Sequence, residues 1–284
     1  NIAKCEYELT HYSLSIDYFN KILALDSNHS ESHFGKGLSY YKLDRLKESR
    51  EALHRVILIK PDFFMAHFFL GEILFKQGNY ELAIMAYEEA LKFNRDFGRV
   101  YLKLAKAYMI QGDATRALDY FKIVLNKKPD YYEALTGSSE CLVALNKYKE
   151  AIVYLERLIS ANPEEPQFFI LLGRAYLGLK EDVMAGKVLK EAAKKFPDSA
   201  DICTLLGNYY RLIMKFKYAV KCYNRSIRLE PDNKNVYLQF GNLYYEFGHG
   251  IENTEMINNY KKYLELGGKA SEVPKNIRDK AGLN

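Results

Sequence analysis

The sequence predicts an all-α fold, a solenoid in which antiparallel helical hairpins follow one another along the chain. Three observations lead to this prediction. Large apolar residues recur at helical spacing, without the alternation of period two that is typical of strands. Five of the seven prolines fall in one register, and small residues form a second column with the same period. A regular period of this kind is typical of repeat architectures.

Residues 64–97 show the predicted hairpin most clearly, as two amphipathic halves separated by Gly78-Asn79. Glycine and asparagine tolerate the left-handed backbone of a helix C-terminal cap, so the first helix should end here and the second should begin at Tyr80. Gly71 lies inside the first helix, where glycine costs roughly 1 kcal/mol relative to alanine. We therefore predict that two helix backbones approach closely at Gly71 and that large side chains interleave around it.

The same pattern returns every 34 residues along the chain. Prolines mark one position of the repeat, with Arg95 in the place of one of them: Pro61, Pro129, Pro163, Pro197 and Pro231. The small residue of the first helix is Gly37, Gly71, Ala105, Ser139, Gly173, Gly207 or Gly241. A bulky residue of the second helix recurs with the same period, as Leu53, Tyr87, Phe121, Leu155, Leu189 and Tyr223. Hairpins should therefore begin near Ser30, Phe64, Gly98, Tyr132, Pro166, Ala200 and Lys234.

A helix-turn-helix period of 34 residues with these columns resembles the tetratricopeptide repeat (TPR) family. The resemblance covers nearly the whole chain. It departs from the family pattern at the position of the usual tryptophan, which is occupied by His33, His67, Tyr101, Leu135, Phe169, Cys203 and Tyr237. The resemblance implies a right-handed superhelical solenoid of TPR hairpins.

We expect a single TPR solenoid over residues 1–284, because each hairpin of a repeat array buries its faces only against its neighbours. Residues 1–29 form a partial first repeat, which suggests a fragment of a longer chain; residues 30–233 form six full repeats, residues 234–268 an irregular seventh and residues 269–284 a C-terminal capping helix. In the seventh repeat Tyr260 matches the bulky column three residues late, so a bulge is expected around Gly248-His249-Gly250. Ser271 is the predicted N-cap of the terminal helix.

Composition argues against several classes of function. Lysine and arginine number 41 against 36 acidic residues, interspersed along the chain, which is typical of a solvated surface rather than a nucleic-acid site. No apolar run approaches the roughly 18 residues needed to cross a bilayer, so we expect no membrane insertion by this segment. The four cysteines lack CxxC spacing and should be buried or half-buried free thiols.

Motifs that carry chemistry are also missing from the sequence. Residues 173–180 lack the Lys-Ser/Thr ending of a P-loop, and neither a nucleophile elbow nor an HExxH motif occurs. His33 and His67 share one column but lie two helices apart, too far to share a zinc ion whose bonds are about 2 Å long. We therefore predict no catalytic residue, no metal site and no cofactor.

The candidate site is a groove along the first helices, where TPR arrays hold segments of partner proteins. The resemblance places groove residues three before, and one and four after, the small residue. In the first three full hairpins the candidate residues at these positions, together with Met65 and Arg99 one turn earlier, are Phe34, Leu38, Tyr41, Met65, Phe68, Phe75, Arg99, Leu102, Lys106 and Met109. Exposed aromatic and methionine side chains in a row mark an adaptable binding surface. We expect an apolar or amphipathic partner segment, with Arg99 and Lys106 contacting acidic groups at one edge.

An alternative interpretation is that Phe34, Phe68 and Phe75 only pack against neighbouring first helices. In the second half of the chain the same positions are polar with scattered aromatics, so we place no site there.

The leading functional prediction is a non-catalytic protein-protein interaction scaffold. Two alternatives stay open. One is a structural TPR segment that self-assembles inside a larger multi-protein machine, for example in secretion, motility or cell-envelope assembly. The other is a regulatory array attached to an enzyme.

Overall fold

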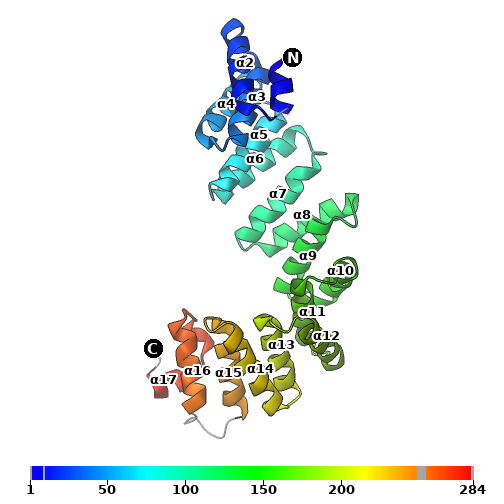
Figure 1. The fold of residues 1–284 in the computed structure, drawn as a ribbon, viewed down its shortest axis with the longest axis vertical. Coiled ribbons are helices and arrows are strands. Elements are labelled where there is room, and N and C mark those ends of the chain that lie inside the picture. Colours follow the sequence, from blue (N-terminus) through cyan, green and yellow to red (C-terminus); the bar gives the residue numbers. More distant parts are fainter. Residues whose placement is uncertain (1, 9, 248–253, 283–284) are drawn as a thin grey trace. The chain divides into compact units, whose positions relative to one another are not determined.

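The computed structural model describes residues 2–8, 10–247 and 254–282, and over these residues the chain contains helices and no strand. It forms two compact units, Asn1–Cys141 (unit 1) and Leu142–Asn284 (unit 2). Figure 1 shows antiparallel helical hairpins following one another in each unit, coloured blue to green in unit 1 and green to red in unit 2. The predicted all-α TPR-like fold class is confirmed. That the two units continue a single solenoid stays a prediction.

The helices alternate between first and second members of hairpins. The helices up to the middle of the chain are α1 (Ile2–Glu8), α2 (Tyr12–Leu25), α3 (Ser30–Lys42), α4 (Leu46–Ile59), α5 (Phe64–Lys76), α6 (Tyr80–Phe93), α7 (Gly98–Ile110), α8 (Ala114–Lys127) and α9 (Tyr132–Ala144). Those that follow are α10 (Tyr148–Ala161), α11 (Pro166–Gly178), α12 (Asp182–Lys195), α13 (Ala200–Leu212), α14 (Phe216–Leu229), α15 (Lys234–Phe247), α16 (Thr254–Glu265), the 3₁₀ turn η1 (Ala270–Glu272) and α17 (Lys275–Ala281). The first helices from α3 to α15 begin at the residues that the 34-residue period predicts.

A bulky side chain of the second helix lies over the glycine of the first helix in the repeated core. A Cβ atom added to Gly71 would lie 2.6 Å from the ring of Tyr87, and one added to Gly173 would lie 2.5 Å from Cδ2 of Leu189. Real Cβ atoms essentially never make contacts this short. The close approach predicted at Gly71 is confirmed, and the tyrosine ring fills the space that a side chain would need.

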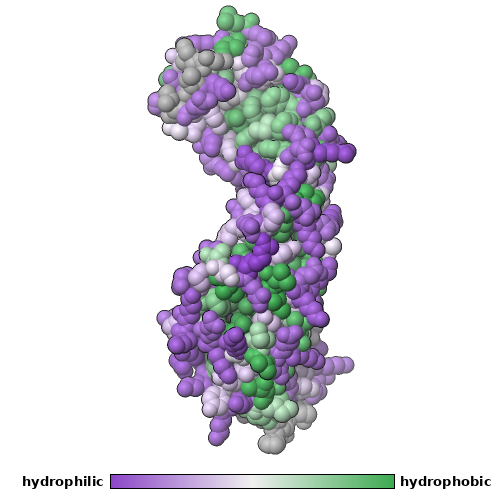
Figure 2. Space-filling model, turned by 90° about the vertical axis from the view of Figure 1, so that its right-hand side faces the viewer, coloured by the Kyte–Doolittle hydropathy of each residue, from purple (hydrophilic) through white to green (hydrophobic). Residues whose placement is uncertain are grey.

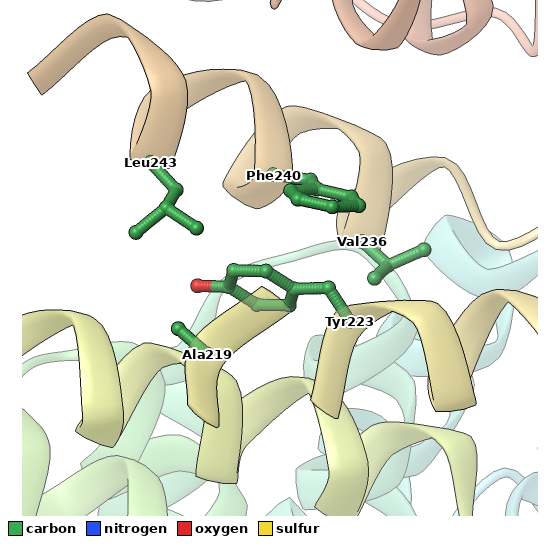
Figure 3. Packing of buried hydrophobic residues seen from close by; sticks show 5 residues of the cluster. All are labelled: Ala219, Tyr223, Val236, Phe240 and Leu243. Carbon is green, nitrogen blue, oxygen red and sulfur yellow. The ribbon is translucent and has the colours of Figure 1, made fainter. Parts of the chain in front are cut away.

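The same bulky residue also packs against the next hairpin. Figure 3 shows Tyr223 of α14 beneath Val236, Phe240 and Leu243 of α15, with Ala219 of its own helix beside it. The ring centroids of Tyr223 and Phe240 are 5.3 Å apart, and Tyr223 is fully buried. One side chain therefore joins its own hairpin to the following one, which is how a repeat array buries a continuous core.

The last hairpin keeps this packing in spite of its altered spacing. Tyr260 is fully buried, and a Cβ atom added to Gly241 would lie 2.7 Å from its ring, so the late tyrosine fills the bulky column as predicted. The bulge expected around Gly248-His249-Gly250 lies outside the described residues.

The predicted N-cap of the terminal helix is wrong. Ser271 lies in η1, and α17 begins only at Lys275, with Pro274 as its N-cap. Val273 is extended, with ψ 133°, because the ring of the following proline disfavours helical backbone in the residue before it. A helix starting at Ser271 therefore could not run through this position.

Three tyrosines of the bulky column donate hydrogen bonds to the side chain that follows the glycine of the first helix. The Tyr87 hydroxyl donates to Oε1 of Glu72 at 2.5 Å. Tyr223 donates to Oδ1 of Asn208 and Tyr260 to Oδ1 of Asn242, each at 2.8 Å. In the hairpins that have leucine or phenylalanine in this column, no such bond can form. The second helix thus orients a groove-position side chain in three hairpins.

We expect Tyr87, Tyr223 and Tyr260 to stay protonated until the chain unfolds. Burial is the main cause that raises the pKa of each hydroxyl above the ordinary value of about 10. Above that pH the unfolded chain releases protons that the folded chain retains, so stability is full below about pH 10 and falls as the pH rises further. In an alkaline titration, the last tyrosines to ionise by ultraviolet absorbance should do so together with the loss of helical circular dichroism. Complete ionisation of all 24 tyrosines before that loss would contradict the assignment.

Candidate partner-binding site

The predicted groove residues lie on three successive first helices of unit 1. Phe34, Leu38 and Tyr41 belong to α3, Met65, Phe68 and Phe75 to α5, and Arg99, Leu102, Lys106 and Met109 to α7. Arg99 is exposed, Phe68 is buried and the other eight are half-buried. Figure 2 shows hydrophobic side chains gathered in patches between hydrophilic ones on the face of the molecule that it presents.

Phe68 is not open to a partner, which corrects its assignment as a groove anchor. Its exposed fraction is 0%. Its ring centroid lies 5.0 Å from that of Phe97 and 5.8 Å from that of Tyr87, and the Arg99 guanidinium lies over it at 5.1 Å. Phe68 is a core residue because Phe97 and Arg99 cover the side of the ring that helical spacing alone would leave open.

The aromatic residues of α3 pack partly against the next hairpin. The ring centroid of Phe34 lies 4.9 Å from that of Phe63 and 5.9 Å from that of Phe69. The ring centroids of Tyr41 and Phe69 are 5.6 Å apart. These contacts match the alternative interpretation in which such rings stabilise helix packing. Because Phe34 and Tyr41 are only half-buried, each also presents apolar surface.

A cavity of about 550 Å³ in unit 1 brings three of the predicted residues together, Arg99, Leu102 and Lys106. Its apolar wall includes Ile123 and Val124 of α8. Five basic side chains line it against two acidic ones: Arg99, Lys103, Lys106, Lys127 and Lys128, with Asp96 and Glu133. The cavity therefore combines an apolar wall with an excess of positive charge.

Three of the five basic groups are already paired. Nζ of Lys103 lies 2.7 Å from Glu72, Nζ of Lys106 lies 2.7 Å from Glu133, and Nζ of Lys127 lies 3.0 Å from Asp96. Arg99 and Lys128 instead lie over aromatic rings, Arg99 over Phe68 and Lys128 over Tyr131 at 5.8 Å. Neither has a carboxylate partner among the residues that the structure describes, so these two cations remain available to an acidic ligand.

Unit 2 contains a second cavity, of about 570 Å³, in the half of the chain where the sequence predicted no site. Its lining consists of Val143, Tyr148, Arg174, Leu177, Gly178, Leu205, Asn208, Arg211, Leu212, Glu246 and Phe247. Five of these occupy the groove positions of their hairpins: Val143, Arg174, Leu177, Asn208 and Arg211. The sequence signal that could have identified it is an arginine at a groove position in each of two consecutive hairpins, each with leucines nearby.

The cysteines are free thiols, as predicted, wherever the structure describes their side chains. Cys141 and Cys203 are buried and Cys222 is half-buried. Burial raises the pKa of Cys222 to about 11 and that of Cys141 to about 12, so neither is a reactive thiolate near neutral pH. Within the described part of the chain, no three His, Cys, Asp or Glu side chains group in a way that could hold a metal ion. None of the described helices has the length and hydrophobicity to cross a membrane.

Three family models match the chain. A tetratricopeptide repeat model matches residues 30–63 and 200–233, a TPR repeat model matches residues 71–112, and a further tetratricopeptide repeat model matches residues 109–175 and 142–209. Together the matches cover residues 30–63 and 71–233, which is more than half of the chain.

Curated relatives match at low identity. BBSome complex member BBS4 of Bos taurus is 22% identical over 192 residues, which are 67% of this chain and 37% of BBS4. A TPR repeat-containing protein of Methanocaldococcus jannaschii is 30% identical over 165 residues, 52% of this chain and 28% of that protein. The chain thus spans about a third of the length of these relatives.

Solved structures share the fold. A tetratricopeptide repeat protein from Parabacteroides merdae has a TM-score of 0.67 at 16% identity, over 90% of this chain and 99% of its own. YrrB, described as a TPR protein with an unusual peptide-binding site, has a TM-score of 0.61 at 16% identity, over 65% of this chain and 95% of its own. With the glycine and bulky columns packed as described above and repeat models matching most of its length, the chain belongs to the tetratricopeptide repeat family.

Proposed function

We propose that the chain is a non-catalytic scaffold whose unit 1 binds an amphipathic, acidic segment of a partner protein. TPR repeats indicate a protein-protein interaction scaffold in general. The observation that carries the finer proposal is the unit 1 cavity, in which Arg99, Leu102 and Lys106 lie together. Its volume of about 550 Å³ falls within the range of cavities that bury most of a ligand's surface.

The chemistry of this site favours a ligand with two kinds of side chain. Arg99 and Lys128 can each bind a carboxylate without first breaking an ion pair. Leu102, Ile123 and Val124 offer apolar surface in the same cavity. A helical partner segment with apolar residues on one face and acidic residues at its edge satisfies both requirements, since residues three and four apart share a helix face.

Half-buried apolar side chains extend the site beyond the cavity. They are Phe34, Leu38, Tyr41, Met65, Phe75 and Met109. Aromatic and methionine side chains supply large contact areas and adapt to different partners, so a few of them should dominate the binding energy. Two related proteins support an interaction role: YrrB has a peptide-binding site by its description, and BBS4 is a member of a complex.

Selection from a random-peptide display library on the wild-type chain, followed by calorimetry of the selected peptides, tests this function. Peptides that combine acidic and large apolar residues should be enriched. Arg99→Gln removes a cation, and Phe75→Ala removes an apolar contact, so each should weaken binding about tenfold or more. Arg50→Gln removes the same charge from an exposed position on α4 and should change the affinity less than twofold.

Arg211→Ala serves as a second control, because Arg211 lies in unit 2. Selected peptides without acidic residues would contradict the proposal. So would a selection in which every peptide binds the Arg99 and Phe75 variants normally and fails to bind Arg211→Ala, since no selected peptide would then use a site in unit 1.

A further inference from the structure

We propose that the cavity of unit 2 is a separate recognition site for a single carboxylate, carried by a partner peptide that has a large apolar side chain beside its acidic residue. Arg174 and Asn208 would bind the carboxylate. This site lies beyond the proposed function, which concerns residues of unit 1 only, and it does not depend on that function.

Arg174 is the cation that remains available in this cavity. It is exposed on α11, directly after Gly173, and its side chain forms no ion pair or hydrogen bond with any other residue that the structure describes. Leu189 of α12 packs against Gly173 and so holds α11, the helix that carries Arg174, in place. An arginine guanidinium can donate two parallel hydrogen bonds to one carboxylate, and such pairs are stronger than bonds between neutral groups.

Arg211, by contrast, is already neutralised. Its Nη1 lies 2.6 Å from Oε1 of Glu246, and its Nη2 donates to Oε1 of Gln239 at 3.4 Å. The Arg211 side chain is only 23% exposed. Arg211 and Glu246 together therefore form a nearly neutral part of the lining, and Glu246 repels any second negative charge.

Asn208 is oriented so that it can act as a donor. Its Oδ1 accepts a hydrogen bond from the Tyr223 hydroxyl at 2.8 Å, and the ring of Tyr223 is held in the core shown in Figure 3. With its oxygen occupied, the amide has its two N–H donors left for a ligand. Asn208 is half-buried and lines the cavity, so a carboxylate bound to Arg174 has a neutral donor in the same lining.

The charge of the lining selects a carboxylate over a phosphate. Two arginines and one glutamate leave a net charge of +1. One ionised carboxylate matches that charge. A phosphorylated side chain carries about −1.5 to −2 at neutral pH, which would exceed the available positive charge and meet Glu246.

The apolar part of the lining selects a peptide over a free small acid. Val143, Leu177, Leu205, Leu212 and Phe247 all contribute to the cavity. A small acid bound to Arg174 would leave this surface in contact with water. A leucine, isoleucine or phenylalanine next to the acidic residue would cover it, with a gain of roughly 25 cal/mol for each Å² of apolar surface removed from water.

An array of octapeptides tests the proposal, with glutamate fixed at a central position, a large apolar residue fixed beside it and the other positions randomised. It is probed with the full chain. The tightest peptides are then resynthesised with a fluorescent label and measured by anisotropy against variants of the full chain. Arg174→Gln should weaken binding about tenfold or more, because a hydrogen-bonded charge pair is lost. Arg174→Lys keeps the charge but loses the two-bond geometry and should give an intermediate loss.

Lys187→Gln is the matched control, because Lys187 is exposed on α12 of the same unit and does not line the cavity. It should change the affinity less than twofold. Replacing the central glutamate of the peptide by glutamine should weaken binding as much as Arg174→Gln does. Replacing that glutamate by phosphoserine should also weaken it.

Three results would overturn the proposal. The first is an array in which no peptide depends on Arg174. The second is equal binding of the glutamine peptide, and the third is tighter binding of the phosphoserine peptide, which would make the cavity a phosphate site. Peptides that lose affinity with Arg99→Gln but not with Arg174→Gln would support the unit 1 function while counting against this site, so the two proposals fail independently.

Discussion

Gly71→Leu should lower the free energy of unfolding by about 3 kcal/mol or more, one of the largest effects that a single substitution in this chain can have. A Cβ atom alone would already lie 2.6 Å from the Tyr87 ring. That ring is fully buried between α5 and α6 and cannot move without disturbing Phe68, whose ring centroid is 5.8 Å away. The branched side chain of leucine would therefore force the two helices apart. Chemical denaturation followed by circular dichroism measures the loss.

A pair of alanine variants separates steric overlap from helix propensity. In an open helical position Gly→Ala stabilises by up to about 1 kcal/mol. Gly98 is such a position, with no atom within 4 Å of an added Cβ, so Gly98→Ala should be neutral or slightly stabilising. Gly71→Ala should destabilise by about 1–3 kcal/mol despite the same gain in propensity. Equal stability of the two alanine variants would show that the close approach at Gly71 does not constrain the fold.

The positions of the helices could be predicted from the sequence because the residues that end helices and the residues that pack the hairpins both recur with the same 34-residue period. Gly78 has φ +77°, the left-handed conformation that a helix end requires, so the residue that ends α5 is visible in the sequence. Gly71 and Tyr87 mark the close contact of the hairpin from both sides. The sequence also predicted that Tyr260 fills the bulky column three residues after its regular place, because only a large residue can fill the space over Gly241.

The accessibility of the groove positions could not be predicted in the same way. Helical spacing fixes which side of α5 carries Phe68 and Glu72, but the side chains of neighbouring elements decide what remains open. Phe97 and Arg99 cover Phe68, and Lys103 and Tyr87 enclose Glu72, which is only 8% exposed. In unit 2 Arg174 and Asn208 occupy the repeat position that Glu72 has in unit 1. Because these residues are polar, the search for apolar residues did not indicate the cavity that they line, which is as large as that of unit 1.

Lys103→Met should lower the free energy of unfolding by about 3 kcal/mol, the second large effect expected. Oε2 of Glu72 lies 2.7 Å from Nζ of Lys103, and Oε1 accepts the hydrogen bond of Tyr87. The Glu72 side chain is 9% exposed and that of Lys103 is 29% exposed, so water solvates the Glu72 carboxylate poorly. Removal of Lys103 leaves a buried carboxylate with one neutral partner, and an uncompensated buried charge is strongly destabilising.

Two comparisons show whether burial of the charge causes this loss. Lys106→Met breaks an ion pair of the same length on the same helix, but Lys106 and Glu133 are 42% and 48% exposed, so the cost should stay below about 1 kcal/mol. In the second comparison Lys103→Met is made in a chain that already carries Glu72→Gln. Glutamine can still accept the Tyr87 hydroxyl but carries no charge, so the cost of losing the lysine should fall to about 1 kcal/mol or less. If Lys103→Met costs the same with glutamate and with glutamine at position 72, Lys103 stabilises α7 through the packing of its aliphatic chain, and the buried ion pair is not what holds α5 and α7 together.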